Sequence, residues 1–227
     1  MKNRKWTKAA LAFSACLFVL WWAMGTGSTL AWFTDSDTVR NDFQIGNLQL
    51  DVSYRNDIVK EYDPLEGTTM AFNDKALYEP GYTQVVYLKI DNEGDVPFKY
   101  KVAVTVEDHT DGKNAWGEDI YLPNYLRYGV VFGENEADVQ KMVEDRLASR
   151  THAPNDWRAL ETWSKVSPYT LPVKAENAEE ESSHYAALIV YMPEEVGNKA
   201  NYRGFDVPQV KLGIKVFAQQ ANAPMEE

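Results

Sequence analysis

The chain has 227 residues, of which 34 are acidic and 23 are basic, so its formal net charge at pH 7 is −11. This charge argues against nucleic acid and anionic lipid as binding partners, because both repel an acidic protein. Divalent cations or basic protein surfaces are the better expected partners. Aromatic residues make up 13% of the chain, which argues against a wholly disordered polypeptide, and the length suffices for one domain with a substantial core.

The first 31 residues have the pattern of a secretory signal peptide. Basic residues come first, an apolar run follows from Ala9 to Met24, and small residues come next. Thr29 and Ala31 supply the small side chains that a signal peptidase accepts, so we predict cleavage between Ala31 and Trp32. The alternative is an uncleaved anchor, although the apolar run of about 16 residues is shorter than the roughly 20 that span a bilayer.

Cleavage at this position would change both the charge and the cysteine content. The leader carries four basic residues and no acid, so its removal changes the net charge from −11 to −15. The only cysteine, Cys16, lies inside the apolar run and not at its end, which argues against a lipoprotein. The mature protein is therefore expected to have no disulfide and to touch a membrane only through its leader before cleavage.

Residues 32–46, the predicted mature N-terminus, form a short segment of their own. It starts with Trp32 and Phe33, is then mostly polar, and becomes apolar again at Phe43 and Ile45. An extended peptide of this kind can add to the open edge of another subunit's sheet. Head-to-tail addition that does not close builds a filament. The alternative is that the segment folds back onto its own sheet and the protein stays monomeric.

Alternation of apolar and polar residues predicts the strands of residues 47–220. The expected strands lie at 48–52, 82–91, 98–106, 125–132, 185–192 and 210–217. The second and third of these runs flank the turn Asn92-Glu93-Gly94-Asp95, which predicts an antiparallel hairpin with one wet and one dry face. Strands joined by Gly, Pro and Asn turns predict an all-β fold, a jelly-roll-like antiparallel β-sandwich.

A short helical insertion is expected at about residues 134–166. Asn135 can cap a helix from Glu136 to Ser149. Four apolar residues share one face of this helix, namely Val139, Met142, Val143 and Leu147. A second helix is expected from Asp156 to Lys165, and its aligned apolar residues are Trp157, Leu160 and Trp163. Residues 176–183 are expected to form a solvated acidic loop, and residues 221–227 a flexible tail.

Three stretches of the chain resemble the TasA/camelysin family of secreted bacterial proteins. The first joins Trp32-Phe33-Thr34-Asp35 to a Phe-x-x-Gly-x-Leu-x-Leu pattern, at Phe43, Gly46, Leu48 and Leu50. The second is Glu79-Pro80-Gly81-Tyr82, followed by a strand and by Asn92-Glu93-Gly94. The third is the last strand, residues 210–216. Residues from about 112 to 183 do not match, so the resemblance covers about half of the mature chain, at both ends.

The resemblance implies a secreted structural protein of the extracellular matrix or cell surface. Proteins of this family form biofilm-matrix fibres by donating the N-terminal strand, and a dedicated signal peptidase removes their leader. For this chain it implies that the donor segment contains Trp32, Phe33, Phe43 and Ile45. The implied partners are further copies of the chain and other matrix proteins. No catalytic, cofactor-binding or metal-binding residue is predicted, and no cofactor.

The resemblance to camelysins also implies a surface metalloprotease as an alternative. A helical zinc protease needs two histidines four residues apart and a carboxylate base. The three histidines, His109, His152 and His184, are far apart in the sequence and are expected at the surface. The chain has no Gly-x-Ser-x-Gly elbow and no cysteine after the leader. A non-enzymatic protein is therefore the preferred prediction.

Two further kinds of site are open from the sequence. Residues 107–112 and Asp35-Ser36-Asp37 cluster oxygen ligands of the kind calcium takes, but neither fits the twelve-residue calcium loop, and Asp111-Gly112 is more simply a turn. A monomeric surface module could bind sugar through an aromatic platform made of Trp157, Trp163, Tyr121, Tyr125, Tyr128 and Tyr169. Core packing around the helical insertion also accounts for these aromatic residues, and it is preferred.

Overall fold

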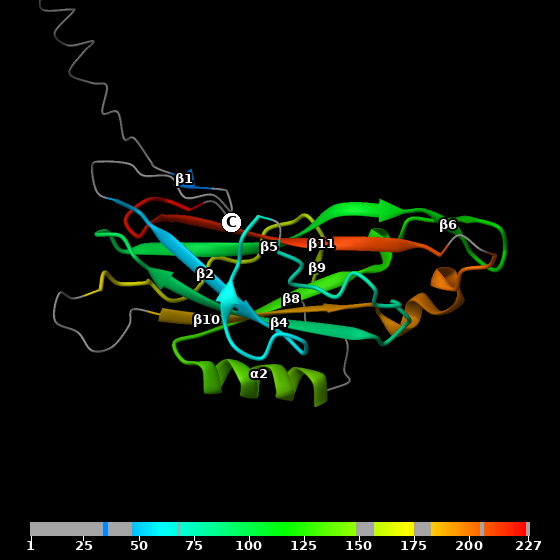
Figure 1. The fold of residues 1–227 in the computed structure, drawn as a ribbon, viewed down its shortest axis with the longest axis horizontal. Helices are drawn as coiled ribbons and strands as arrows, with labels where there is room; N and C mark the ends of the chain where they lie inside the picture. The colour runs from blue at the N-terminus through cyan, green and yellow to red at the C-terminus, as the bar shows by residue number, and fades with distance from the viewer. Residues whose placement is uncertain are drawn as a thin grey trace, which may run out of the picture. The chain divides into compact units, whose positions relative to one another are not determined.

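The computed structural model describes residues 34–35, 47–67, 69–148, 157–174, 183–204 and 207–225. Within these ranges the chain forms two antiparallel β-sheets that enclose a common core, with a helix against the outer face of the larger sheet (Figure 1). The predicted all-β sandwich with a helical insertion is confirmed. No helix in the described ranges is long and apolar enough to cross a membrane.

The larger sheet has six strands in the order β3-β2-β4-β10-β8-β9. Their bounds are β3 (Asp63–Pro64), β2 (Leu50–Arg55), β4 (Thr83–Asn92), β10 (Ser183–Tyr191), β8 (Arg127–Gly133) and β9 (Arg158–Ala159). The longest of these strands, β4 and β10, lie at the centre of the sheet. The two-residue strands β3 and β9 lie at its edges.

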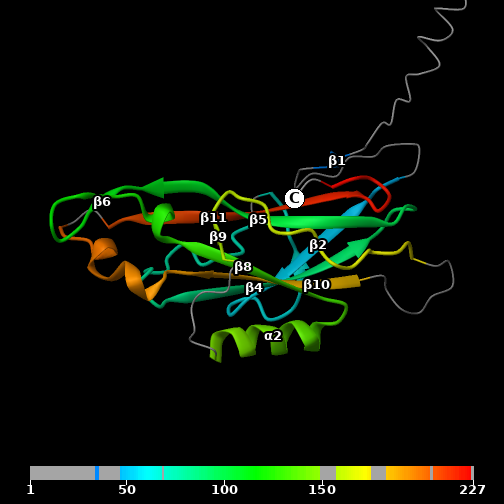
Figure 2. The same ribbon diagram turned by 180° about the vertical axis from the view of Figure 1, so that it is seen from behind.

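The smaller sheet has three strands in the order β1-β11-β5. They are β1 (Thr34–Asp35), β11 (Gln209–Gln220) and β5 (Phe98–Thr110). A separate ribbon consists of β6 (Gly112–Lys113) and β7 (Asp119–Ile120), and the helices are η1 (Leu122–Tyr125), α2 (Glu136–Ala148) and η2 (Glu194–Ala200). Figure 2 shows β5 and β11 on one side of the core, and β4, β8 and β10 on the other.

The core is built from alternate residues of the long strands. On β5, the side chains of Phe98, Tyr100, Val102 and Val104 are completely buried, as the alternation predicts. They join one apolar cluster with residues of β4 and β10, which are Val86, Leu88, Ile90, Ala186, Leu188 and Val190. Burial of apolar surface, at about 25 cal/mol per Å², is the main force that holds the two sheets together.

The long strands β4 and β5 do not form the hairpin that the sequence predicts, so that prediction is wrong. β4 pairs with β2 and β10 in the larger sheet, whereas β5 pairs with β11 in the smaller one. The connection at residues 92–95 therefore carries the chain from one sheet to the other. Each strand still turns its apolar face to the common core, so the alternation fits this arrangement as well as a hairpin.

Backbone contacts with residues 47–49 fix this connection. The Glu93 N–H donates to the Gln49 carbonyl oxygen at 2.9 Å, and the Asp95 N–H donates to the Asn47 carbonyl oxygen at 2.9 Å. A Cβ atom added to Gly94 would lie 2.1 Å from the same Asn47 oxygen. Glycine is therefore required at position 94, because any side chain would push the two backbones apart.

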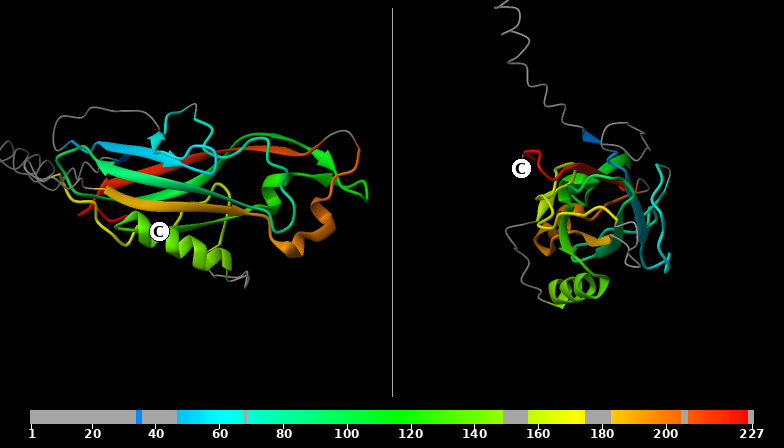
Figure 3. Two further views of the ribbon diagram at one scale, coloured as in Figure 1. Left: turned by 60° about the horizontal axis from the view of Figure 1, so that its bottom comes forward. Right: turned by 90° about the vertical axis from the view of Figure 1, so that its left-hand side faces the viewer.

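The helix α2 forms a third layer against the larger sheet (Figure 3). Asn135 caps it as predicted, because its Oδ1 accepts a hydrogen bond from the Asp138 N–H at 2.9 Å. Val139 and Val143 are buried against β8 and β10. Met142 and Leu147, which were expected on the same face, are 39% and 47% exposed. The helix contacts the sheet along a narrow stripe only one residue wide per turn, and these two residues flank it.

The second predicted helix, from Asp156 to Lys165, is wrong for its described part. Residues 158–159 form β9, and the following segment runs along the outer edge of β5. The N–H groups of Glu161, Ser164, Ser167 and Leu171 donate to the carbonyl oxygens of Val104, Val102, Tyr100 and Phe98, respectively. Successive hydrogen bonds start from residues three or four apart in this segment, but they end at residues two apart on β5. This three-residue spacing also separates Trp157, Leu160 and Trp163, and it imitates the period of a helix.

Candidate functional site

The smaller sheet has two edges, and they differ in how they are covered. The outer edge of β5 is hydrogen-bonded to the segment 161–171 over most of its buried length. The other edge is formed by β11. Within the described residues, only β1 pairs with its outer side, and it does so at two positions, Thr34 opposite Gln219 and Asp35 opposite Ala218.

The direction of each peptide group of β11 follows from the alternation of an antiparallel ladder. The Ala221 N–H donates to the Pro97 carbonyl oxygen, in register with the pairing of β11 and β5. The pairing of β11 with β5 shifts its register between Lys211 and Leu212. Beyond this point, odd-numbered residues of β11 turn their peptide groups to β5, and even-numbered residues turn theirs away. Between Lys211 and the two residues that pair with β1, the outward peptide groups of β11 belong to Leu212, Ile214 and Val216.

The inner face of β11 is slightly less covered than that of β5. Leu212, Ile214 and Val216 are 4%, 6% and 8% exposed, whereas the four core residues of β5 are 0% exposed. The core side chains of β11 are therefore buried, but slightly less completely than those of β5. An added strand with apolar side chains would complete both the ladder and the core there.

The outer face of β11 carries the exposed cations Lys211 and Lys215. The Nζ atom of Lys211 lies 3.4 Å from the Oδ2 atom of Asp108 on β5. Between the lysines, a Cβ atom at Gly213 would lie 2.3 Å from the Oε1 atom of Glu107, so glycine leaves room for that side chain. Charged side chains on an exposed strand limit unspecific edge pairing, and these two lysines favour an acidic incoming strand.

The larger sheet also ends in short strands. The outer sides of β2 and β8 are paired with β3 and β9, each at two positions. Beyond β9, the edge of β8 borders a mostly apolar cavity of about 260 Å³. Residues of β8, of β9 and of the segment beside β5 line it, namely Val130, Phe132, Arg158, Ser164, Lys165, Val166 and Pro168. This edge of β8 therefore faces the segment beside β5, whereas the only described segment beside the outer edge of β11 is the two-residue strand β1.

The two described histidines lie in different environments. His109 is exposed near the end of β5, with its Nε2 atom 3.7 Å from Asp111 Oδ1. His184 is only 6% exposed on β10, so the expectation of a surface histidine is wrong at this position. It contacts the rings of Tyr100 and Tyr169, and burial lowers its pKa below the usual value of 6.5, although Glu134 opposes this. His152 lies outside the described residues.

The candidate metal ligands do not gather into a site in the part of the chain that is described. No group of three or more His, Cys, Asp or Glu residues there could hold a metal ion. Asp108 faces Lys211, and Asp111 lies in the connection between β5 and β6. Asp35 belongs to β1, whereas Ser36 and Asp37 lie outside the described residues.

The six candidate aromatic residues are distributed over several places. Tyr128 is completely buried, and Tyr125 packs against the same core. The other four each meet a different ring partner, in the pairs Trp157–Tyr191, Trp163–Phe217, Tyr169–His184 and Tyr121–His109. They do not form one shared platform, and packing accounts for most of them.

The predicted cleavage and donor residues cannot be placed against this edge. Thr29, Ala31, Trp32, Phe33, Phe43 and Ile45 all lie outside the described residues. The edge itself was not identified from the sequence. The alternation of Lys211 and Lys215 with apolar residues was the available signal, because inserted lysines are typical of edge strands.

Models of known protein families give no match to this chain. Curated proteins give no match either.

Proposed function

We propose that the protein is a secreted, non-enzymatic structural protein that assembles into extracellular biofilm-matrix or cell-surface fibres. Residues 32–46 of one copy would add as a strand to the outer edge of β11 in the next copy. The observation that carries this proposal is the outer edge of β11, a strand of 12 residues: the only described segment on that edge is the chain's own two-residue β1, which a donated strand would replace. Unpaired N–H and C=O groups in a row are a template for another chain.

The register of β1 defines where a donated strand would lie. If the strand continues in the register of Thr34 and Asp35, Val39 falls opposite Ile214 on the inner face. Asp42 falls opposite Lys211 on the outer face. An apolar pair on the dry side and an opposite-charge pair on the wet side each stabilise a sheet by about 0.2–1 kcal/mol.

Charge explains why assembly should require controlled conditions. The protein without its predicted leader carries a net charge of −15, so copies repel one another. In the register of β1, Asp37 falls opposite Val216 on the inner face, where an ionised carboxylate is costly. Mild acidification reduces both penalties, so filaments should form more readily below neutral pH.

Export and processing would come before assembly. The leader would hold the donor segment at the membrane, and a dedicated signal peptidase would release Trp32 as the new N-terminus. Filaments should therefore appear only after cleavage and only outside the cell. Other matrix proteins with open sheet edges are further partners under this proposal.

The test is negative-stain microscopy of two purified proteins, residues 32–227 and residues 47–227, after mild acidification. The first should form regular filaments. The second retains every strand of the sandwich except β1 and should stay folded and monomeric. Circular dichroism and thermal melting check that the shorter protein is folded. Filaments formed by residues 47–227 would contradict strand donation.

A further inference from the structure

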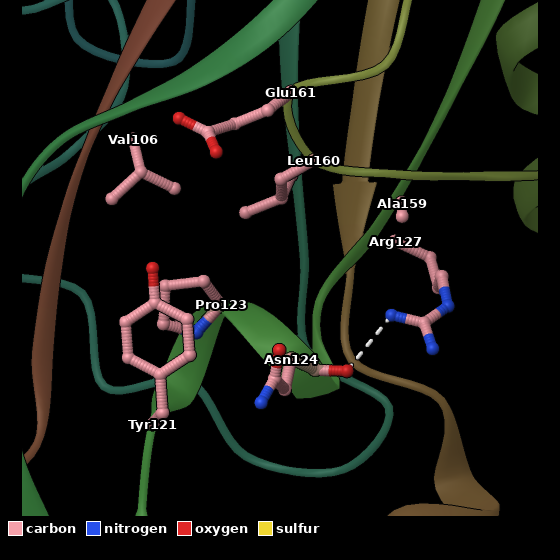
Figure 4. A pocket seen from close by; sticks show the side chains of 8 residues that line it. All are labelled: Val106, Tyr121, Pro123, Asn124, Arg127, Ala159, Leu160 and Glu161. Carbon is pink, nitrogen blue, oxygen red and sulfur yellow. Dashed lines mark hydrogen bonds between the residues drawn. The ribbon is translucent and has the colours of Figure 1, made fainter.

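A small cavity of about 190 Å³ lies between η1, the end of β5 and the turn after β9 (Figure 4). We infer that this cavity binds one ring of a neutral sugar. Eight residues line it: Val106, Tyr121, Pro123, Asn124, Arg127, Ala159, Leu160 and Glu161. It is distinct from the outer edge of β11, so the inference does not depend on fibre assembly.

The size of the cavity limits the ligand to a small group. Pockets for drug-sized molecules have volumes of about 300–1,000 Å³, and this one is smaller. Its walls include the apolar side chains of Val106, Pro123 and Leu160, and the latter two are buried. Such walls suit the C–H face of a sugar ring.

Three polar groups surround the same space. In Figure 4 the Tyr121 hydroxyl and the Glu161 carboxylate both point into it, and Asn124 lies at its border. Within the described residues, the hydroxyl, the carboxylate and the Asn124 side-chain amide have no hydrogen bond to protein atoms. They are therefore available to a ligand, with acceptors on Glu161, donors on Asn124 and both on Tyr121.

Arg127 organises the cavity and is not its principal ligand group. Its Nη1 atom donates to the carbonyl oxygens of Asn124 and Leu126, at 2.9 and 2.7 Å. These bonds fix the end of η1 and hold Asn124 at the border of the cavity. The lining residues include one cation, Arg127, and one anion, Glu161, so their formal charges sum to zero, which suits a neutral ligand.

Glu161 occupies an unusual backbone position. Its φ angle is +64°, and it is the only described residue other than glycine with a positive φ. Its N–H donates to the Val104 carbonyl oxygen at 2.8 Å, which holds the turn in place. Glycine or asparagine would adopt this conformation with less strain. Strained residues gather at functional sites, and here the strain places a carboxylate in the cavity.

These features favour a sugar over other small ligands. A phosphate or acidic group would be repelled by Glu161, and a divalent cation needs more oxygen ligands than one carboxylate supplies. A purely apolar group would contact the walls of the cavity but would use none of its three polar groups. Each hydroxyl of a sugar both donates and accepts, so one ring can satisfy Glu161, Asn124 and Tyr121 together.

The test is saturation-transfer-difference NMR on the protein secreted by a host that expresses the complete sequence. The probes are glucose, galactose, mannose and N-acetylglucosamine at millimolar concentration. At least one should give signal with the wild-type protein. Glu161→Gln and Tyr121→Phe should weaken its binding about tenfold or more, whereas Glu93→Gln, with the same charge change at an exposed turn residue, should bind as the wild type.

Glu161→Gly separates binding from stability. It removes the carboxylate and relieves the positive φ, so it should abolish binding without lowering the melting temperature. Three results would overturn the inference: no signal from any of the four sugars, unchanged binding by Glu161→Gln and Tyr121→Phe, or binding of a lysine-containing peptide in place of sugar. Filament formation should be unchanged in all three cavity variants, which keeps this test separate from that of the proposed function.

Discussion

The strands β10 and β11 are both long and apolar, but they are surrounded very differently. β10 is paired with β4 along its whole length and with β8 along most of it, and it is buried on both faces. In the part of the chain that is described, β11 is paired along its length with β5 but on its other side only with the two residues of β1, and its outer face carries the exposed Lys211 and Lys215. β10 is therefore expected to contribute chiefly to stability, whereas the outer edge of β11 is the place where we propose that another chain is added.

The largest difference between the two strands should appear in stability. Leu188 on β10 is completely buried, so Leu188→Ala should lower the free energy of unfolding by about 3–5 kcal/mol. Leu212→Ala removes the same atoms from β11, where the side chain is slightly less buried and lies near a sheet edge, and should cost about 2–3 kcal/mol. Urea unfolding of both variants measures this. Equal losses would show that the two strands are equally embedded.

Assembly should depend on the outward N–H of Val216. Val216→Pro removes that N–H without removing a ladder bond to β5, and proline is tolerated on edge strands. It should abolish filaments in the 32–227 protein while the sandwich stays folded. Val216→Ala loses comparable side-chain volume but keeps the N–H, so it should still assemble. Filaments formed by a folded Val216→Pro protein would place the acceptor edge elsewhere.

The free energy of unfolding should also depend on pH through His184, which lies on β10. Burial lowers the pKa of His184 in the folded state below 6.5, so at acidic pH the unfolded chain binds the proton more tightly. Stability is therefore complete above about pH 6.5 and falls as the pH drops through the folded-state pKa. Urea unfolding across this range should show the decrease, and His184→Gln should reduce it. An equal decrease in His184→Gln would assign the effect to other groups.

The smallest effect should come from the link between α2 and the sheet. Arg55 on β2 stacks over the ring of Tyr87 at 4.2 Å, and its Nη2 lies 2.6 Å from Glu136 Oε1. These groups are partly exposed, so Arg55→Met should cost only about 1 kcal/mol. Thermal melting measures the loss. A much larger loss would mean that this link, and not Val139 and Val143, holds α2 on β10.

Much of the fold could be predicted because alternation reports burial on one face. The strands that contain Val102, Leu188 and Ile214 were located correctly, and so was the cap of α2 at Asn135. Alternation does not report which strand is the neighbour. The runs before and after Gly94 therefore resembled a hairpin although they belong to different sheets.

Other features depended on contacts that have no local signal. The three-residue spacing of Trp157, Leu160 and Trp163 resembled a helix, but it comes from a segment that follows β5 with extra residues between its hydrogen bonds. The burial of His184 depends on rings from distant parts of the chain. The cavity at Glu161 likewise joins three separate segments. None of these could be read from neighbouring residues.

The most direct test of strand donation is disulfide cross-linking between two single-cysteine proteins. The only cysteine of the chain, Cys16, lies in the predicted leader, so Thr34→Cys and Gln219→Cys in the 32–227 protein each carry one thiol. These positions are paired in the register of β1. Mixed under assembly conditions, the two proteins should form a disulfide-linked dimer that contains one copy of each, as mass spectrometry can show. A double variant, Thr34→Cys with Gln219→Cys, carries both thiols in one chain. If the mixed dimer does not form and the double variant gives only a monomer closed by its own disulfide, the segment folds back on its own sheet. That result would contradict strand donation.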